Sequence, residues 1–441
     1  MSTVKSFFLE SILWAGDSYL KTSFIQNLRK WRKILSKNQG QLEEIQRQKL
    51  KELLTFATQN SPFYREQNVH SLDNPMDWLK SFPVLKKSTF RENLPSILTR
   101  TIDSGLAEVM SSGSTGPPSK VYFSKDEISS NRALQVIWWE WAGYRFGDSI
   151  LQTGVNMKRS REKAVKDKLL NTRYIDALSH SEEQILEELR LTQKKPRDFF
   201  IGYASSLYLF AKIALENDIT DIKFKSIISL GEKLLPRFRE IIEKAFHCKV
   251  YDTYGASEGF LIASQCKVGS YHVMSPHVLV ELLDDEDNEV ENGQLGRVVI
   301  TGLDNFTTPM IRYEVGDLAI KSADKTCSCG LQLPMLEEVV GRITEFLTTP
   351  NGKFITVQTV VRILKQFPEV EQFKLVQVDR ESYRLIYISS KSQEEVREKD
   401  IQLMFESVFK ESLQIAFEKV RFLPKVKTGK FQLIENLYKP S

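Results

Sequence analysis

A ten-residue segment, Ser111–Lys120, constrains the fold and function of this chain more than any other stretch. It reads SSGSTGPPSK, with four hydroxyl side chains ahead of Gly116. Glycine lets a backbone approach a ligand closely, and backbone amides together with small hydroxyl groups are suited to surround an anion. We predict short strands on either side, at Ala107–Met110 and Val121–Phe123, so this loop differs from the strand–loop–helix phosphate loop. The residues alone leave a phosphate cradle and a plain surface loop both open.

Length and composition predict an ordinary globular protein of two or three domains, since the 441 residues are 41% hydrophobic and 27% charged. A net charge of +4 gives no argument for a nucleic-acid partner. The apolar side chains of Phe7–Trp14 fit one side of an amphipathic helix, on a core or on a membrane surface, but Glu10 and Asp17 argue against a signal peptide or membrane span. Four cysteines do not make a disulfide scaffold, so we expect a cytoplasmic location.

The order of elements predicts an α/β fold. Residues 1–70 have helical spacing, clearest over Gln41–Thr58, and short apolar runs then alternate with helices. Such alternation predicts a largely parallel sheet, with ligands at the carboxyl ends of its strands. We expect strands at Ser149–Gly154, Asp198–Gly202, Ser226–Leu230 and Lys249–Tyr254, and helices at Asp126–Phe146, Ser181–Gln193, Ala204–Glu216 and Pro236–Phe246. The first of these helices carries Trp138, Trp139 and Trp141, for which core packing is favoured over a pocket wall.

Two further regions follow. Residues 260–340 are rich in strand patterns and complete a large domain, 1–340, whereas 341–441 forms a small α+β domain. In the first region we expect strands at His277–Leu283, Gly296–Thr301, Met310–Tyr313 and Leu318–Lys321. In the second we expect helices at Val357–Gln366 and Gln393–Leu413 and strands at Gln372–Asp379, Tyr383–Ser390 and Glu418–Leu423.

Four stretches in this order resemble the motifs of the adenylate-forming superfamily. They are Ser111–Lys120, Tyr254–Glu258, Arg312–Asp317 and Pro424–Lys430. Within that superfamily the chain is similar to the phenylacetate–CoA ligase-like branch, through Phe306–Tyr313, His272–His277 and Cys327–Gly330 ahead of Gly341-Arg342. The segment Thr349–Ile355 is most similar to short members from capsular-polysaccharide clusters. The resemblance covers nearly the whole chain and implies a large N-terminal domain and a small mobile C-terminal lid.

The resemblance implies that ATP and a carboxylic acid condense to an acyl-adenylate, with CoA or another acceptor then displacing AMP. Magnesium would be held by Glu258, because a hard cation prefers carboxylate oxygen. Tyr254 would stack on the adenine with Gly231 and Glu232 along its edge, and Asp317 would accept the ribose hydroxyls. The remaining implied nucleotide-binding residues are Ser112, Gly113, Ser114, Thr115, Gly116, Gly255, Ser257, Arg312 and Arg342. Lys430, on the small domain, would be the catalytic cation of the first half-reaction.

Taken singly, several of these residues have plainer interpretations. Glu258 alone would be a surface carboxylate and Asp317 a turn former, and only their joint occurrence favours the site. For Lys430, one of several lysines in the tail, a solvated side chain is the minor alternative. The chain also departs from its relatives, because Ser119 replaces a lysine after the loop and Glu345 stands at a hinge position usually held by aspartate. The departure at Glu345 puts the swing of the small domain, and thus thiol transfer, in doubt.

Two pairs of soft ligands stand far apart in the sequence. Cys266 and His272 flank a short turn, and Cys327 and Cys329 flank one serine. Three thiolates and an imidazole are a combination that zinc favours, but spacing alone slightly favours unrelated cysteines. The resemblance favours a structural zinc, since related chains bind a metal with this pattern. His277 is a reserve ligand, and Cys248 is expected in the core.

The leading hypothesis is therefore an AMP-forming ligase that uses ATP, Mg²⁺, a small carboxylic acid and CoA or another acceptor. A nucleotidyltransferase that moves AMP to a non-carboxylate acceptor and a non-catalytic nucleotide-binding protein are the alternatives. The sequence identifies neither the acid nor the acceptor, and it does not give the oligomeric state.

Overall fold

The computed structural model describes residues 2–20, 22–110, 119–154, 167–168, 170–176, 182–256, 258–342, 347–350, 354–355, 360, 363–364, 366–392, 395–423 and 433–438. The chain forms two compact units, one from most residues up to Val339 and one from Val340 onward, to which Gly316–Leu318 also groups. Among the described residues, no helix is both long and apolar enough to cross a bilayer.

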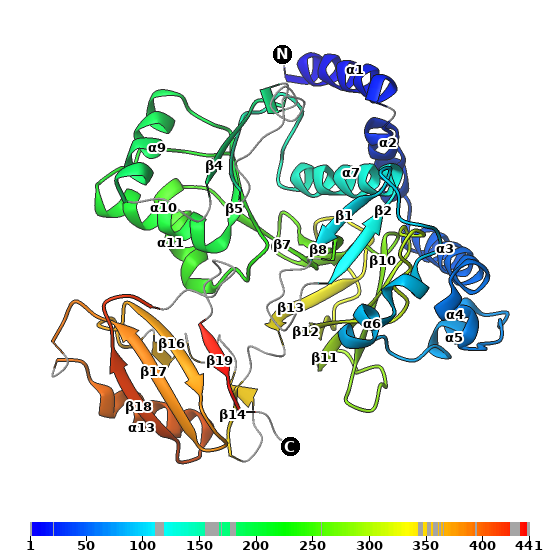
Figure 1. Cartoon of the computed structure of the whole chain (residues 1–441). Coiled ribbons are helices and arrows are strands. Elements are labelled where there is room, and N and C mark those ends of the chain that lie inside the picture. The colour runs from blue at the N-terminus through cyan, green and yellow to red at the C-terminus, as the bar shows by residue number, and fades with distance from the viewer. Residues whose placement is uncertain are drawn as a thin grey trace. The chain divides into compact units, whose positions relative to one another are not determined.

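Helices make up the first part of the chain, as predicted (Figure 1). They are α1 (Ser2–Leu20), α2 (Phe24–Leu35), α3 (Gln39–Asn60), α4 (Pro62–Glu66), α5 (Pro75–Lys80) and α6 (Lys87–Ile97). A capping box between Asn38 and Gln41 starts α3, since each side chain bonds the other's backbone N–H. Leu9 and Leu13 of α1 pack on a core cluster, whereas Trp14 stays more than half exposed.

A short hairpin precedes the sheet. The antiparallel strands β1 (Ala107–Met110) and β2 (Lys120–Phe123) lie on either side of the loop 111–118, as the sequence predicted. Lys120 Nζ lies 3.1 Å from Glu108 Oε2 across the hairpin. Ser119 is buried and Lys120 is exposed, so the two side chains point to opposite faces of the hairpin. The loop itself lies outside the described residues.

The predicted parallel sheet is confirmed in the middle of the chain. Its strands are β3 (Ile150–Gly154), β4 (Thr172–Asp176), β5 (Phe199–Tyr203), β6 (Ser226–Leu230) and β7 (Val250–Ala256), in the order β4-β3-β5-β6-β7. Helices α9 (Glu182–Lys194), α10 (Ala204–Glu216) and α11 (Pro236–Phe246) gather on one face (Figure 1). The other face packs on α2 and α7 (Lys125–Trp141). Buried side chains on both faces explain the continuous apolar runs of these strands.

The helix α7 is shorter than predicted, because the chain reverses at Gly143, whose φ of +95° lies in the left-handed region. Its three tryptophans belong to the core, which the sequence analysis favoured over a pocket wall. Trp138 is buried in the cluster beneath α7, and Trp139 and Trp141 pack against it.

The sheet continues beyond β7 with antiparallel strands. These are β8 (Phe260–Gln265), β9 (Tyr271–Val273), β10 (Val278–Leu283), β11 (Leu295–Gly302), β12 (Tyr313–Lys321) and β13 (Met335–Arg342). They extend the sheet in the order β7-β8-β9-β13-β12-β11-β10, which gives eleven strands in all. The prediction of separate strands at Met310–Tyr313 and Leu318–Lys321 was wrong, because residues from Tyr313 to Lys321 form one strand. Strand β13 was not predicted.

The smaller unit is an α+β arrangement. Its elements are β14 (Leu347–Thr348), β15 (Phe354–Ile355), β16 (Gln372–Gln377), β17 (Ser382–Ile388), α13 (Glu398–Phe409), β18 (Gln414–Lys419) and β19 (Ile434–Asn436). Four of these strands form a sheet in the order β18-β17-β16-β19. The predicted helix Gln393–Leu413 is shorter in the structure. The predicted strand Glu418–Leu423 instead runs from Gln414 to Lys419, after a short turn that follows the helix.

A carboxyl group is buried where the parallel and antiparallel strands meet. Asp252 of β7 accepts a hydrogen bond of 2.6 Å from Tyr271 Oη of β9, and its Oδ1 has no hydrogen-bond partner among the described residues. Burial, the dominant cause, raises the pKa of Asp252 to about 6, although the Tyr271 hydrogen bond opposes it. An unfolded aspartate has a pKa of about 3.9. Between about pH 4 and pH 6, Asp252 therefore keeps its proton in the folded protein and loses it in the unfolded chain.

We predict that Asp252 makes stability depend on pH. Because its folded pKa is raised, the contribution of Asp252 to the free energy of unfolding should be greatest below about pH 4 and fall by about 3 kcal/mol as pH rises through about 6. Asp252→Asn should remove this fall and raise the thermal midpoint at pH 7 by several degrees, with little difference near pH 4. The exposed Asp285→Asn is the control. Parallel pH profiles for the wild type and Asp252→Asn would contradict the prediction.

Candidate active site and metal centre

Glu258 stands in the tight turn between β7 and β8. Gly259 permits this turn, because its φ of +97° lies in the left-handed region. A Cβ at this position would lie 2.8 Å from the Phe123 ring. The Glu258 side chain is only 2% exposed, and its Oε1 accepts a hydrogen bond of 2.8 Å from Tyr313 Oη. The plain interpretation as a surface carboxylate was therefore wrong. A buried carboxylate needs partners or a cation, which fits the predicted metal-binding role.

Glycines at the carboxyl ends of β6 and β7 cannot be replaced without clashes. Gly231 has a φ of +71°, and a Cβ there would lie 2.7 Å from the ring of Tyr203. A Cβ at Gly255 would lie 2.6 Å from the Phe260 carbonyl oxygen.

Glu232, predicted beside the adenine, accepts a hydrogen bond of 2.9 Å from the backbone N–H of Ser205. Tyr254, the predicted stacking partner, is buried against the core of the larger unit. The site residues of β6 and β7 thus lie where ligands bind α/β sheets.

Two other predicted nucleotide ligands belong to the antiparallel strands. Asp317 is buried within β12, so the plainer interpretation as a turn former was wrong. Arg342 is the last residue of β13. The remaining predicted positions, Ser112, Gly113, Ser114, Thr115, Gly116, Ser257 and Lys430, lie outside the described residues, as does Glu345.

Arg312 has a structural role in the described contacts. Its guanidinium is buried and pairs with Glu281, with Nε 3.2 Å from Oε2 and Nη2 3.1 Å from Oε1. Its Nη1 also donates to the carbonyl of Phe82 at 2.8 Å. The prediction that Arg312 lies near phosphate or ribose therefore gains no support, because its donors hold the segment before α6 against the sheet. Sequence reasoning missed Glu281, which is an ordinary acidic residue in an apolar strand.

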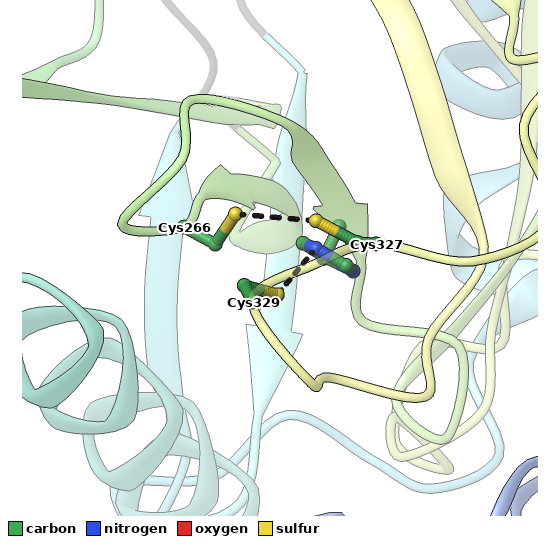
Figure 2. Close-up of side chains that lie close together, drawn as sticks. Cys266, Cys327 and Cys329 are labelled. Carbon is green, nitrogen blue, oxygen red and sulfur yellow. Dashed lines mark hydrogen bonds between the residues drawn. The ribbon is translucent and has the colours of Figure 1, made fainter.

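The four predicted zinc ligands are brought together in the larger unit. One ligand atom from each of Cys266, His272, Cys327 and Cys329 lies within 4.8 Å of all the others. The Sγ atoms of Cys266 and Cys327 are 3.8 Å apart, and Cys329 Sγ is 3.3 Å from His272 Nε2. Figure 2 shows the three thiols converging from two different segments of the chain. All four cysteines of the protein are free thiols, so no disulfide links them.

The surroundings of His272 prepare it to ligate through Nε2. Its Nδ1 lies 3.3 Å from the Leu333 carbonyl, which selects the tautomer that leaves Nε2 unprotonated. Burial lowers the pKa of His272, which favours the neutral form that binds metals. The ring of Trp141 meets the imidazole edge to face.

The reserve ligand His277 is not part of the cluster, because its Nδ1 contacts Asp304 at 2.9 Å. Cys248 packs at the edge of the core beside α11, close to the expectation.

Comparison with known proteins identifies the relatives of this chain. It is 23% identical over 406 residues to Protein CapK of Staphylococcus aureus, covering 88% of each chain. It is 26% identical over 347 residues to the phenylacetate-coenzyme A ligase of Pseudomonas putida, covering 74% of this chain and 76% of the relative. No protein-family model matches the chain.

Solved structures share the fold of this chain. The crystal structure of a 2-hydroxyisobutyryl-CoA ligase in the postadenylation state superposes with a TM-score of 0.70 at 19% identity, covering 89% of each chain. ATP-bound MatB of Rhodopseudomonas palustris gives 0.56 at 17% identity, over 75% of this chain and 68% of that one. The chain is a homologue of CapK and of the phenylacetate–coenzyme A ligases, with the adenylate-forming fold. The resemblance inferred from the motifs is thereby confirmed.

The contacts of Arg312 generate a stability prediction. Arg312→Met should destabilise the larger unit by about 3–5 kcal/mol, because Glu281 would remain buried without its counter-charge. The double variant Arg312→Met/Glu281→Leu should recover most of that loss, measured by thermal denaturation. A double variant no more stable than the single one would show that the ion pair is not the cause.

Proposed function

We propose that the protein is an AMP-forming acid–CoA ligase. It would condense a carboxylic acid with ATP to an acyl-adenylate and pyrophosphate, and then transfer the acyl group to CoA or another acceptor. The support that carries the proposal is homology over most of the chain to enzymes named phenylacetate-coenzyme A ligases. The names of these enzymes include the acid and the thiol, and the fold is shared with a ligase crystallised with an acyl-AMP.

The residues of the chain fit this chemistry. Magnesium bound to triphosphate would neutralise charge at the reacting phosphate, and Glu258 is the buried carboxylate suited to hold it. The glycine-only positions Gly231 and Gly255 would allow a nucleotide to approach the carboxyl edge of the sheet. We keep Tyr254, Asp317 and the loop Ser112–Gly116 as nucleotide contacts, and Lys430 as the catalytic cation. All of these assignments are part of the proposal.

The acceptor is the less constrained half of the proposal. CoA is favoured because it appears in the names of several relatives, whereas an amide bond synthetase shares the fold at a TM-score of 0.55 and 16% identity. A nucleotidyltransferase and a non-catalytic nucleotide-binding protein remain alternatives. A cytoplasmic place in capsular-polysaccharide biosynthesis stays a prediction.

Glu258→Gln should abolish adenylation while leaving the protein folded. Loss of the anionic metal ligand should lower the rate about a thousandfold, which corresponds to about 4 kcal/mol. The measurement is acid-dependent ATP–pyrophosphate exchange, first screened on the wild type over aromatic, hydroxylated and aliphatic acids. Glu286→Gln, in an exposed turn, is the matched control. Near-normal exchange by the folded Glu258→Gln protein would remove Glu258 from the site.

We also propose that Cys266, His272, Cys327 and Cys329 hold a structural zinc. Two thiolates bound to tetrahedral zinc at about 2.3 Å lie about 3.8 Å apart, which agrees with the separation of Cys266 and Cys327. A disulfide would need about 2.05 Å. Burial raises the pKa of Cys329 to about 12, so this thiol needs a cation nearby before it ionises at neutral pH. Four protein ligands complete the coordination, so the metal would bind the turn after β8 to the segment before β13.

Protein purified without added metal should therefore contain about one zinc ion per chain. Cys327→Ser/Cys329→Ser should lose the metal and lower the thermal midpoint, since binding free energy contributes to folding. Cys248→Ser, outside the cluster, should retain it. A metal-free wild-type protein of full stability would disprove the zinc site.

A further inference from the structure

A lysine from the N-terminal helices reaches the buried carboxylate of the candidate active site. Lys87 Nζ, from the first residue of α6, lies 3.7 Å from Glu258 Oε1. This is an ion pair but too long for a hydrogen bond. Lys87 donates no hydrogen bond within the described part of the chain. Its ammonium therefore keeps three donors available while supplying a counter-charge to Glu258.

The exposure of the two partners differs in a way that a ligand could use. The Glu258 side chain is 2% exposed, whereas that of Lys87 is 26% exposed. Both contacts of Glu258 go to Oε1, from Tyr313 and Lys87, which leaves Oε2 without a hydrogen bond among the described residues. A metal could bind Oε2 while the ammonium remains open to an anion arriving from solvent.

The position of Lys87 is also unfavourable for its own helix. A cation in the first turn opposes the helix dipole, by about 0.3–1 kcal/mol. The first turn of α6 contains no acidic residue, and Lys86 at the N-cap makes no side-chain cap. Such a local disadvantage is characteristic of positions retained for a site rather than for stability.

We propose that Lys87 is a phosphate-binding residue of this site. Before nucleotide binds, its ammonium is the counter-ion of Glu258. When Mg²⁺ bound to ATP takes over that carboxylate, Lys87 turns its free donors to the β- and γ-phosphates. The proposal rests on the proposed function, in which Glu258 holds the metal, and adds a cation from outside the four recognised motifs.

If Lys87 leaves Glu258 for the β- and γ-phosphates, it should distinguish ligands that carry these phosphates from ligands that lack them. Mg·ATP carries the phosphates that leave as pyrophosphate, and AMP lacks them. Lys87→Met should therefore weaken Mg·ATP binding roughly ten- to a hundredfold, the loss of one charge-assisted contact, and leave AMP binding unchanged. A residue that only supported the fold would weaken both ligands equally.

The experiment is calorimetric binding of Mg·ATP and of AMP, without acid, to the full chain. Lys87→Arg keeps the positive charge and should restore most of the Mg·ATP affinity, and Lys87→Gln provides a polar variant if Lys87→Met is poorly folded. Lys86→Met removes the same charge from the exposed neighbour and should bind both ligands like the wild type. In pyrophosphate exchange, Lys87→Met should raise the KM for ATP more than it lowers kcat.

Three results would overturn the inference. They are equal weakening of Mg·ATP and AMP, unchanged binding of both, and a loss at Lys86→Met as large as at Lys87→Met. Failure of the proposed function is recognised separately, on the wild type alone. If that protein binds neither AMP nor Mg·ATP and no acid supports exchange, both the function and the role of Lys87 are rejected before any variant is compared.

Discussion

The pairing of β7 determines the arrangement of the candidate active site. This strand lies parallel to β6 on one side and antiparallel to β8 on the other. The β7–β8 ladder has a register shift at Tyr254/Gly255, where only a glycine fits beside the carbonyl of Phe260. An irregular ladder followed by a glycine turn re-aims the side chains that follow it. Glu258 can be buried at the carboxyl edge of the parallel strands because this one strand joins the two halves of the sheet.

A second constraint brings a distant segment to the same place. Leu85 forms a parallel bridge with Tyr313, with Leu85 N 2.8 Å from the Arg312 carbonyl and Glu314 N 3.0 Å from that of Leu85. This bridge brings Lys87 and Tyr313 to the same carboxylate oxygen, Oε1 of Glu258. The buried Arg312–Glu281 pair holds the same segment through the Phe82 carbonyl. Breaking that pair would leave a buried charge, so its influence on the site is indirect and acts through the backbone.

The sequence predicted those parts of the structure in which local pattern and burial agree. The parallel strands have apolar runs, and the candidate ligands Cys266/His272 and Cys327/Cys329 form pairs that are close in the sequence. Strand β13 was missed because MLEEVVGR carries two glutamates, and one face of an antiparallel strand can be polar. Lys87 had no sequence signal at all, since one lysine among many is recognised only through its neighbour in space.

The two candidate centres use the antiparallel strands in different ways. The four residues of the candidate metal centre lie after β8, within β9 and before β13, and β9 pairs with both of those strands. Strand β9 has only three residues, so few backbone hydrogen bonds hold it in the sheet. Bonds from its side chain to a metal would therefore add most to stability at this strand. Strand β8 begins two residues after Glu258. A zinc that fixes the far end of β8 would therefore also restrain the turn that buries the carboxylate, and a structural metal would influence catalysis without touching substrate.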